Sequence, residues 1–382
     1  MGLRAYLVPA IIVAALIFAA YLAGPRPGVE NPTTITSSSM VERFPGLSAE
    51  PPPASLEIKV EGGVKYIVHP SLIVSGGPPK DGIPSIDEPK FVSADEADEF
   101  LSPDDWVIGL RLGNTARAYP HMILVWHEIV NDWVEGVPVA IAYCPLCLSS
   151  IAFYRVIESE PVEFGTTGKL YNSDLVMYDR KTDTYWAQLT GVGIYGELAG
   201  YRLKRVPVDF MRWSDWRSLY PDTEVLSTDT GYSRPYGSDP YGNYYTSPAI
   251  YFPLTHEDPR LHPKTIVYGV VVNGVARAYP YDVVGGIGAV NDLVGGEPVV
   301  VMSPGKDMVR VYRRVVAGIT LTFEYRDGFF WDRETGSKWN FEGEAIEGPM
   351  KGSALERMIG VTCFWFAWAA FYPGTSIYGG GG

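Results

Sequence analysis

The chain contains one long unit twice, and this internal repetition limits what it can fold into. Arg117-Ala118-Tyr119-Pro120 returns as Arg277-Ala278-Tyr279-Pro280, a spacing of 160 residues from 117 to 277. Solenoid and propeller repeats have periods of about 20 to 50 residues, so a period this long predicts a duplicated domain. Further matches relate Val130-Asn131-Asp132 to Val290-Asn291-Asp292, Tyr154-Arg155 to Tyr312-Arg313, Asp179-Arg180 to Asp332-Arg333, and Trp213 and Trp216 to Trp365 and Trp368.

The composition is that of a globular protein with large cores. Of 382 residues, 46% are apolar, which suffices for two or three ordinary domains. Glycine, proline, tyrosine and tryptophan are plentiful, and this mixture favours short strands and tight turns over long helices. We therefore expect a mainly β fold (β-rich α+β) in two tandem homologous repeats with a few short helices. The formal charge of −13 disfavours nucleic acid as a partner.

The N-terminus predicts a membrane anchor. Residues 1–24 contain an apolar run from Ala5 to Gly24 behind Arg4, and about 20 helical residues span a bilayer core. No clean cleavage site follows, which favours an uncleaved transmembrane anchor; cleavage would give a secreted protein instead. The positive residue precedes the run, so we expect the bulk of the protein outside the cytoplasm, at the cell surface or in a periplasm-like space. The membrane is the expected partner, and no protein partner is indicated.

The rest of the chain divides by composition and by the repetition. Residues 231–263 are rich in tyrosine, proline and glycine, and are interpreted as a linker, a crossover packed over the first repeat, or a binding surface, with a structural role favoured. The expected units are an anchor or signal (1–24), a Pro/Ser/Thr-rich tether (25–55), the first repeat (56–230), the connector (231–263), a second, degenerate repeat (264–378) and a glycine tail (379–382).

Each repeat opens with a predicted β-hairpin. In the first, strands over 106–112 and 115–119 flank Gly113-Asn114. In the second, Asn273-Gly274 is a strong hairpin signal, because both turn residues tolerate positive φ. The next predicted elements are a short helix after Pro120 and strands over 137–143, 151–155, 298–302 and 308–313.

The first repeat carries a cysteine pair that the second lacks. Cys144-Pro145-Leu146-Cys147 falls opposite residues 303–307, where there is no cysteine. Two sulfurs at this spacing bind one soft metal ion, or form a disulfide that opens and closes. Zinc ribbons and glutaredoxins both use a Cys-Pro-x-Cys turn, but neither a second knuckle nor a thioredoxin-like setting accompanies it here. A metal site, a redox dithiol and an inert pair all stay open, in that order of preference.

Other residues specific to the first repeat extend the candidate site. Neither His127 nor His121 has a histidine counterpart, and the stretch 162–179 is six residues longer than its counterpart 321–332. A Cys-Cys-His set outside the cytoplasm favours copper before zinc. The predicted metal ligands are Cys144, Cys147 and His127, with His121, Met177 and Asp174 as further candidates and Tyr171, Asn172 and Ser173 as other residues specific to this repeat.

Residues that both repeats share are interpreted as scaffold, because they persist where the cysteines are missing. Arg117 and Asp132 belong to this group, and Cys363, among aromatic residues, is predicted to be a buried hydrophobic residue. No phosphate loop, dinucleotide fingerprint, His-Glu-x-x-His or Gly-x-Ser-x-Gly motif is present, so we expect no nucleotide cofactor. The sequence does not decide whether the protein is an enzyme.

Four segments make the chain resemble the family called domain of unknown function 3179 (DUF3179). The resemblance covers residues 106–378 and implies an exported or membrane-anchored bacterial or archaeal protein, without an established reaction. The segments are Trp126-His127-Glu128-Ile129-Val130-Asn131-Asp132, Tyr143-Cys144-Pro145-Leu146-Cys147, Asn172 to Arg180, and Phe364-Trp365-Phe366-Ala367-Trp368.

Three functional hypotheses follow. The first is an anchored extracytoplasmic protein that binds copper or zinc through Cys144, Cys147 and His127. The second is a thiol-disulfide oxidoreductase in which Cys144 attacks and Cys147 resolves. The third is a non-catalytic structural or interaction module of the cell surface. Geometry separates them, because metal ligands converge on one ion at about 2.0 to 2.3 Å and a redox thiol needs access to solvent.

Overall fold

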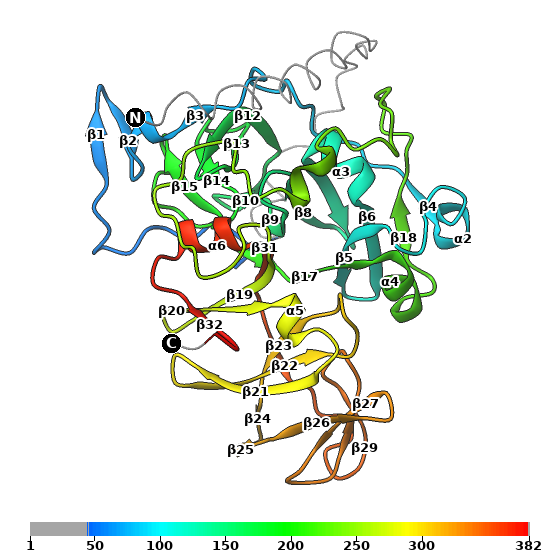
Figure 1. Ribbon diagram of the computed structural model, residues 1–382. Coiled ribbons are helices and arrows are strands. Elements are labelled where there is room, and N and C mark those ends of the chain that lie inside the picture. Colours follow the sequence, from blue (N-terminus) through cyan, green and yellow to red (C-terminus); the bar gives the residue numbers. More distant parts are fainter. Residues whose placement is uncertain (1–43, 45, 381–382) are drawn as a thin grey trace.

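The computed structural model describes residue 44 and residues 46–380 (Figure 1). The predicted anchor over residues 1–24 lies outside them, as does most of the tether predicted over 25–55. The end of that tether lies against the globular body, because Ala49 N donates to Val156 O and Glu50 pairs with Arg202. No helix in the described part of the chain combines the length and the apolar character needed to cross a bilayer.

The fold is β-rich with a few short helices, which confirms the predicted class. Ser93 caps its helix with a capping box, in which its side chain and that of Glu96 each bond the other's backbone N–H. The helices are α2 (Ala94–Ala97), α3 (His121–His127), α4 (Trp213–Leu219), α5 (Tyr281–Val284) and α6 (Trp365–Phe371), with 3-10 turns η2 (Pro70–Leu72) and η3 (Gly242–Thr246).

Three sheets contain all the longer strands of the first half, by which we mean residues 56–230. In sheet order, the seven-stranded sheet holds β1 (Lys59–Glu61), β2 (Val64–Tyr66), β15 (Val192–Tyr195), β14 (Tyr185–Ala187), β13 (Asp174–Asp179), β12 (Phe164–Tyr171) and β3 (Val74–Ser75). The five-stranded sheet holds β17 (Val208–Arg212), β5 (Trp106–Leu112), β6 (Thr115–Pro120), β18 (Glu224–Leu226) and β4 (Phe91–Ser93).

The third sheet, of eight strands, crosses from the second half (residues 264–378) into the first. Thr362 pairs with Ser150 at the junction. Figure 1 shows α6 beside the strands of the first half. The order is β32 (Ser376–Ile377), β20 (Val275–Pro280), β19 (Ile266–Val272), β31 (Val361–Phe364), β9 (Ser149–Tyr154), β8 (Val137–Cys144) and β7 (Ile129–Val134), with β16 (Arg205–Val206) paired to β9.

The remaining strands form two four-stranded sheets of the second half and two small ribbons. The first sheet holds β21 (Gly288–Val294), β22 (Glu297–Ser303), β23 (Arg310–Arg313) and β30 (Glu356–Met358). The second holds β26 (Phe323–Arg326), β27 (Phe329–Asp332), β28 (Lys338–Trp339) and β29 (Ala345–Glu347). The ribbons are β10 (Val156–Ile157) with β11 (Glu160–Pro161), and β24 (Val315–Val316) with β25 (Ile319–Thr320).

The two predicted opening hairpins are confirmed and share one packing device. β5 pairs with β6, and β19 with β20, in registers that match residue for residue at the spacing of 160. A tryptophan lies flat against a glycine in each: a Cβ at Gly109 would be 2.2 Å from the Trp216 ring, and one at Gly269 would be 2.3 Å from Trp368. Glycine is required at both positions because the ring occupies the space of a side chain.

Buried polar contacts also recur in both halves, and they correct one detail of the sequence comparison. Arg155 N and Nη1 donate to Pro138 O and Val162 O, and the same two bonds are made by Arg314, not by Arg313. The match of Tyr154-Arg155 with Tyr312-Arg313 is therefore wrong by one residue. The duplication of the whole unit stays a prediction that these equivalent contacts favour.

An ion-pair cluster joins the halves through Asp209 of β17. Both of its carboxylate oxygens accept from Arg310, at 2.9 and 2.7 Å, and Arg357 Nη2 donates to it at 2.5 Å. Asp209 and Arg310 are buried, and each would be costly to desolvate alone. Burial would raise the pKa of Asp209, but the two arginines outweigh it and lower the pKa below its ordinary value.

Candidate metal centre

The cysteine pair forms the loop of the hairpin between β8 and β9. Cys144 ends β8 opposite Ser149, and the loop closes by a bond from Cys147 N to Cys144 O of 3.3 Å. Leu148 completes the turn with a φ of 55°. The turn points both sulfurs into the protein, where Cys144 is 1% exposed and Cys147 is fully buried. The chain thus presents two thiols side by side in its main core.

A second hairpin brings a carboxylate to the two sulfurs. β12 and β13 are joined by Asn172-Ser173, whose φ values of 54° and 59° allow a two-residue turn, and Asp174 follows directly. Asp174 Oδ1 accepts from Cys147 Sγ at 3.0 Å. The sulfurs of Cys144 and Cys147 and a carboxylate oxygen of Asp174 all lie within 4.8 Å of one another. Asp174 was one of the further candidate ligands named from the sequence.

The six extra residues predicted for the first repeat are what carries Asp174 to the site. Phe164 pairs with Asp179 at the base of the first hairpin, as Phe323 pairs with Asp332 at the base of the second. From that shared base, residues 164–179 form a hairpin six residues longer than residues 323–332. Asp174 lies in the extension, so the second half has no counterpart for it.

Neighbouring polar groups hold the carboxylate in place. Asp174 Oδ2 accepts from Leu189 N at 2.9 Å, and Ser149 Oγ lies 3.3 Å from Oδ1 and 3.1 Å from Cys147 Sγ. Gln188 accepts a 2.5 Å bond from Ser149 and donates to Ala142 O. Both Gln188 and Ser149 are fully buried, which fixes the hydroxyl between carboxylate and thiol.

Burial moves the ionisable groups of the site toward their neutral forms. It raises the pKa of Asp174 to about 7, although bonds from Leu189 N and Cys147 partly oppose it. It also raises the pKa of Cys144 and of Cys147 above the ordinary thiol value. These are the expected shifts for acids that lose water on burial.

Glu128 is a second buried carboxylate near the site, and sequence reasoning missed it. It is 7% exposed, and burial together with the charge of Asp174 raises its pKa to about 8. Its φ of 58° with ψ of −33° is unfavourable for a residue with a side chain. The equivalent residue of the second half is Gly288, with φ of 91°. This exchange of glycine for glutamate was visible at the spacing of 160 residues.

The connector and the second half cover the cysteine loop. Tyr244 donates its hydroxyl to Leu146 O at 2.9 Å, and Phe364 N donates to Cys147 O at 2.8 Å. Above them lies Lys264, whose Nζ is 3.0 Å from the centre of the Tyr244 ring. Burial lowers the pKa of Lys264 to about 7, while Cys147 and Cys144 act to raise it. Of the three interpretations of residues 231–263, the crossover packed over the first half is the one observed.

The structure places His127 outside this group. Its Nδ1 is 2.8 Å from Pro84 O and its Nε2 is 2.7 Å from the Tyr236 hydroxyl, so both ring nitrogens are engaged. Burial lowers the pKa of His127 to about 4, which keeps the ring neutral. Among the His, Cys, Asp and Glu side chains of the described residues, only that of Asp174 converges with the two cysteines. His127 is therefore corrected from a ligand to a buried, hydrogen-bonded histidine.

The other predicted site residues have structural surroundings. His121 Nε2 lies 2.8 Å from the Tyr143 hydroxyl, and Met177 is buried in the main core. Tyr171 packs edge-on against Phe371, and Asn172 Oδ1 accepts from Thr255 N and Oγ1. Ser173 is fully buried, and its hydroxyl has no hydrogen-bond partner among the described residues. Cys363 is buried, as predicted.

The geometry does not favour the redox alternative. Attack on a disulfide requires a thiolate that a partner can reach. Cys144 and Cys147 are buried beneath Tyr244 and Phe364, and their raised pKa keeps them protonated. Both are free thiols in this structure.

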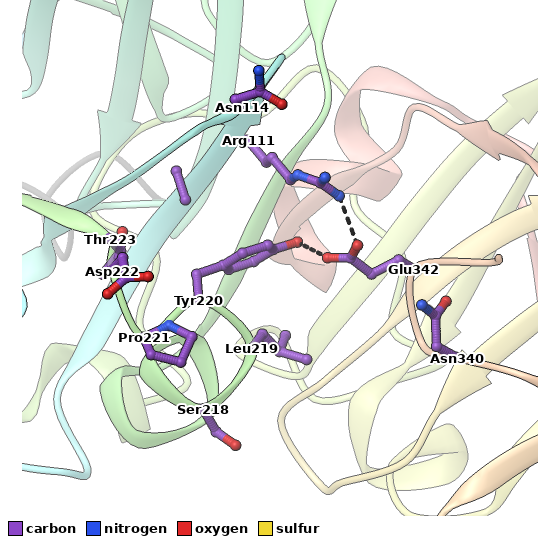
Figure 2. A pocket seen from close by; sticks show the side chains of 11 residues that line it. Arg111, Asn114, Ser218, Leu219, Tyr220, Pro221, Asp222, Thr223, Asn340 and Glu342 are labelled. Carbon is purple, nitrogen blue, oxygen red and sulfur yellow. Dashed lines mark hydrogen bonds and ion pairs between the residues drawn. The ribbon is translucent and has the colours of Figure 1, made fainter. Parts of the chain in front are cut away.

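A surface pocket of about 500 Å³ lies elsewhere, where the halves meet. Figure 2 shows Arg111 and Tyr220 of the first half directed at Glu342 of the second. Arg111 Nη1 donates to Glu342 at 2.6 Å, and the Tyr220 hydroxyl bonds the same carboxylate. Arg111 and Glu342 thus neutralise each other in this pocket, and neither cysteine is among the residues that line it.

Fold and site together define a β-rich protein with a buried dithiol-carboxylate centre, assembled from two hairpins of one half and covered by the other. The chain belongs to the family described as "Protein of unknown function (DUF3179)", whose sequence model matches residues 80–375. Neither the curated proteins nor the solved structures contain a significant match to the chain.

Proposed function

We propose that this protein binds one transition-metal ion at Cys144, Cys147 and Asp174, with zinc preferred to copper. The observation that carries the proposal is the convergence of the three ligand atoms within 4.8 Å, all from buried residues. Thiolates and carboxylates are established zinc ligands, at about 2.3 and 2.0 to 2.2 Å. Small movements of these side chains would bring the two sulfurs and the carboxylate oxygen into contact with one ion.

The ligand set decides the order of the two metals. Cys144, Cys147 and His127 favoured copper, because all three ligands would be soft or of intermediate softness. Asp174 in place of His127 supplies a harder oxygen, which suits Zn²⁺ better than Cu⁺. Three protein ligands also leave one tetrahedral position, which water or a further group can occupy.

Metal content of the purified full-length chain tests the proposal. We expect about one zinc per chain in the wild type and a loss of most of it in Cys144→Ser, because the ion loses one of three protein ligands. His127→Gln and Cys363→Ala are the matched controls and should keep the metal. Retention of zinc by Cys144→Ser, or its loss in His127→Gln, would contradict the assignment.

Location is the second part of the proposal. The apolar segment over residues 1–24 supports a membrane anchor that holds the described residues outside the cytoplasm. A metal would protect the paired thiols in such an oxidising compartment. Recovery of the full-length chain in the aqueous fraction after membrane separation, with its N-terminus intact, would contradict the anchor.

A further inference from the structure

One buried side chain of the second half has no role in the metal site described above. Lys264 is 6% exposed, and no hydrogen-bond partner for its Nζ is found among the described residues. Burying an ammonium group without a partner is costly, so a folded protein normally pairs it or keeps it at the surface. Lys264 therefore requires a compensating charge or a function.

Lys264 lies against the residues that cover the cysteine loop. Aromatic rings hold it: the Nζ lies 3.0 Å from the ring centre of Tyr244 and 5.3 and 5.1 Å from those of Phe364 and Phe366. Tyr244 and Phe364 are the two residues that bond the backbone of the loop, at Leu146 O and Cys147 O. The acidic groups that act on the ammonium most strongly are Cys147 and Cys144.

Comparison of the halves shows that this lysine is specific to the second. Trp365 N and Phe366 N donate to Thr265 O and Pro263 O, on either side of Lys264. In the first half, Trp213 N and Ser214 N donate to Asp105 O and Pro103 O, on either side of Asp104. Asp104 is exposed. The same backbone position is thus an exposed acid in one half and a buried base in the other.

We infer that Lys264 is the counter-ion of the metal centre, a positioning residue through which the second half completes the site of the first. This inference rests on the proposed metal site. Two thiolates and one carboxylate carry three negative charges, of which a divalent ion offsets two. Lys264 offsets the third, so that the occupied centre is neutral within a medium of low polarity. The second half is then part of the binding site rather than a degenerate support.

The charge balance also predicts which ion the site prefers. A monovalent ion with the same three ligands leaves one negative charge uncompensated after Lys264 is counted, and burial penalises it. A divalent ion leaves none. Lys264 accordingly strengthens the preference for Zn²⁺ over Cu⁺ that Asp174 introduces.

The test compares zinc affinity of the full-length chain by competition with a chromophoric chelator. We expect Lys264→Met to bind Zn²⁺ roughly 10- to 100-fold more weakly than the wild type, as one unit charge at short range gives at an effective dielectric constant of about 20. Lys264→Arg should recover most of the affinity, because it keeps the charge. Lys338→Met is the matched control: Lys338 Nζ also lies over an aromatic ring, 3.6 Å from Phe329, but in the second half's own sheet.

Cobalt substitution adds a readout that a merely structural lysine would not change. A positive charge beside a thiolate stabilises its electrons, so Lys264→Met should move the sulfur-to-cobalt charge-transfer band to lower energy, and Lys264→Arg should return it. Wild type and Lys264→Met with equal zinc affinity and identical bands would overturn the counter-ion and leave the metal site standing. Wild-type protein without zinc affinity would overturn the metal site and the counter-ion together.

Discussion

The hairpin of β12 and β13 and the hairpin of β26 and β27 each begin at a buried Phe-Asp pair, and they end in different turns. The second ends early, in an exposed Asp327-Gly328 turn with a glycine where φ is positive. The first runs six residues further and turns inside the protein on Asn172-Ser173, with no glycine. The longer hairpin therefore has an unfavourable turn and a buried hydroxyl without a partner among the described residues, and both lie directly beside Asp174.

Glu128, which follows α3, and its equivalent Gly288 show the same kind of difference between the halves. A positive φ is easy for Gly288, whereas Glu128 adopts it at a cost and places a carboxylate near Asp174. The first half thus departs from the favourable local choice at two turns, and both departures add polar groups to one site.

Asp174→Asn should cause the largest change, because it removes the ligand that only the longer hairpin supplies. Zinc affinity should fall by at least roughly a hundredfold, more than losing an outer-shell partner usually costs. Chelator competition measures it. Asp183→Asn, at an exposed turn of the same half, is the control and should bind zinc like the wild type. Equal affinity of Asp174→Asn and Asp183→Asn would remove Asp174 from the site.

Asp209→Asn tests how the halves hold each other. It leaves Arg310 buried without its anionic partner, so the free energy of unfolding should fall by about 3 to 5 kcal/mol. Denaturant unfolding measures the loss. Asp229→Asn, whose ion pair with Lys90 is exposed, should leave the free energy of unfolding almost unchanged, because solvent screens exposed ion pairs. Losses of similar size in both variants would show that the buried cluster has no special weight.

The stability of the metal-free protein should depend on pH in an unusual direction. The folded state raises the pKa of Glu128 to about 8 from an ordinary 4.5, so it retains a proton that the unfolded chain has lost. The stability from this group is present below about pH 4.5 and is lost as pH rises toward 8, by a few kcal/mol. Unfolding of chelator-treated protein across that range measures the slope.

Glu128→Gln should reduce this pH dependence, because the amide does not titrate, while Asp174, whose pKa burial raises to about 7, keeps its own part of the slope. Glu99→Gln, an exposed change, should keep the slope of the wild type. A difference in the free energy of unfolding between metal-free wild type and Glu128→Gln that stays constant from about pH 4.5 to 8 would contradict the burial of an acidic group at this position.

Glu128→Gly makes the first half resemble the second at the strained turn. The metal-free protein should gain about 1 to 2 kcal/mol, because glycine adopts the positive φ without strain. Gly288→Ala is the opposite test: its Cβ would meet the Tyr325 side chain at 2.2 Å, so that variant should lose stability. A loss of stability in Glu128→Gly would show that the glutamate supports the fold instead of burdening it.

Ser173→Gly should have the smallest effect. It gives the longer hairpin the Asn-Gly turn that its backbone favours and removes a buried hydroxyl without a partner. The expected gain is about 0.5 to 1 kcal/mol, seen as a rise of about one degree in Tm. Asn172→Gly, which removes the bonds to Thr255, should be destabilising and serves as the contrast.

The sequence predicted the parts of this site that arise from local pattern. Both opening hairpins, the cysteine turn and the six extra residues around Asp174 follow from alternation, turn residues and a comparison of the two halves; that these residues lengthen a hairpin came from the structure. His127 was misassigned because absence from the other half says that a residue differs, not what it contacts. Its partners Pro84 and Tyr236 are distant in sequence, and only folding brings them together.

Lys264 could not be found by the same route. Residues specific to the first half were the candidates, whereas this lysine is specific to the second half and lies near the cysteine site of the first. Its burial depends on Tyr244 of the connector and Phe364 of β31, which no periodicity relates. Glu128 is different, since its exchange with Gly288 is visible in the sequence. The positive φ values of both residues then show that Glu128 occupies a backbone conformation that suits glycine.

X-ray absorption at the zinc edge of the purified, zinc-loaded full-length chain tests the central claim most directly. The predicted spectrum has two sulfur neighbours at about 2.3 Å and oxygen neighbours at about 2.0 to 2.2 Å. The sulfur neighbours would be Cys144 and Cys147, and the carboxylate of Asp174 would supply oxygen. A zinc ion surrounded by nitrogen and oxygen alone, without sulfur, would contradict the account.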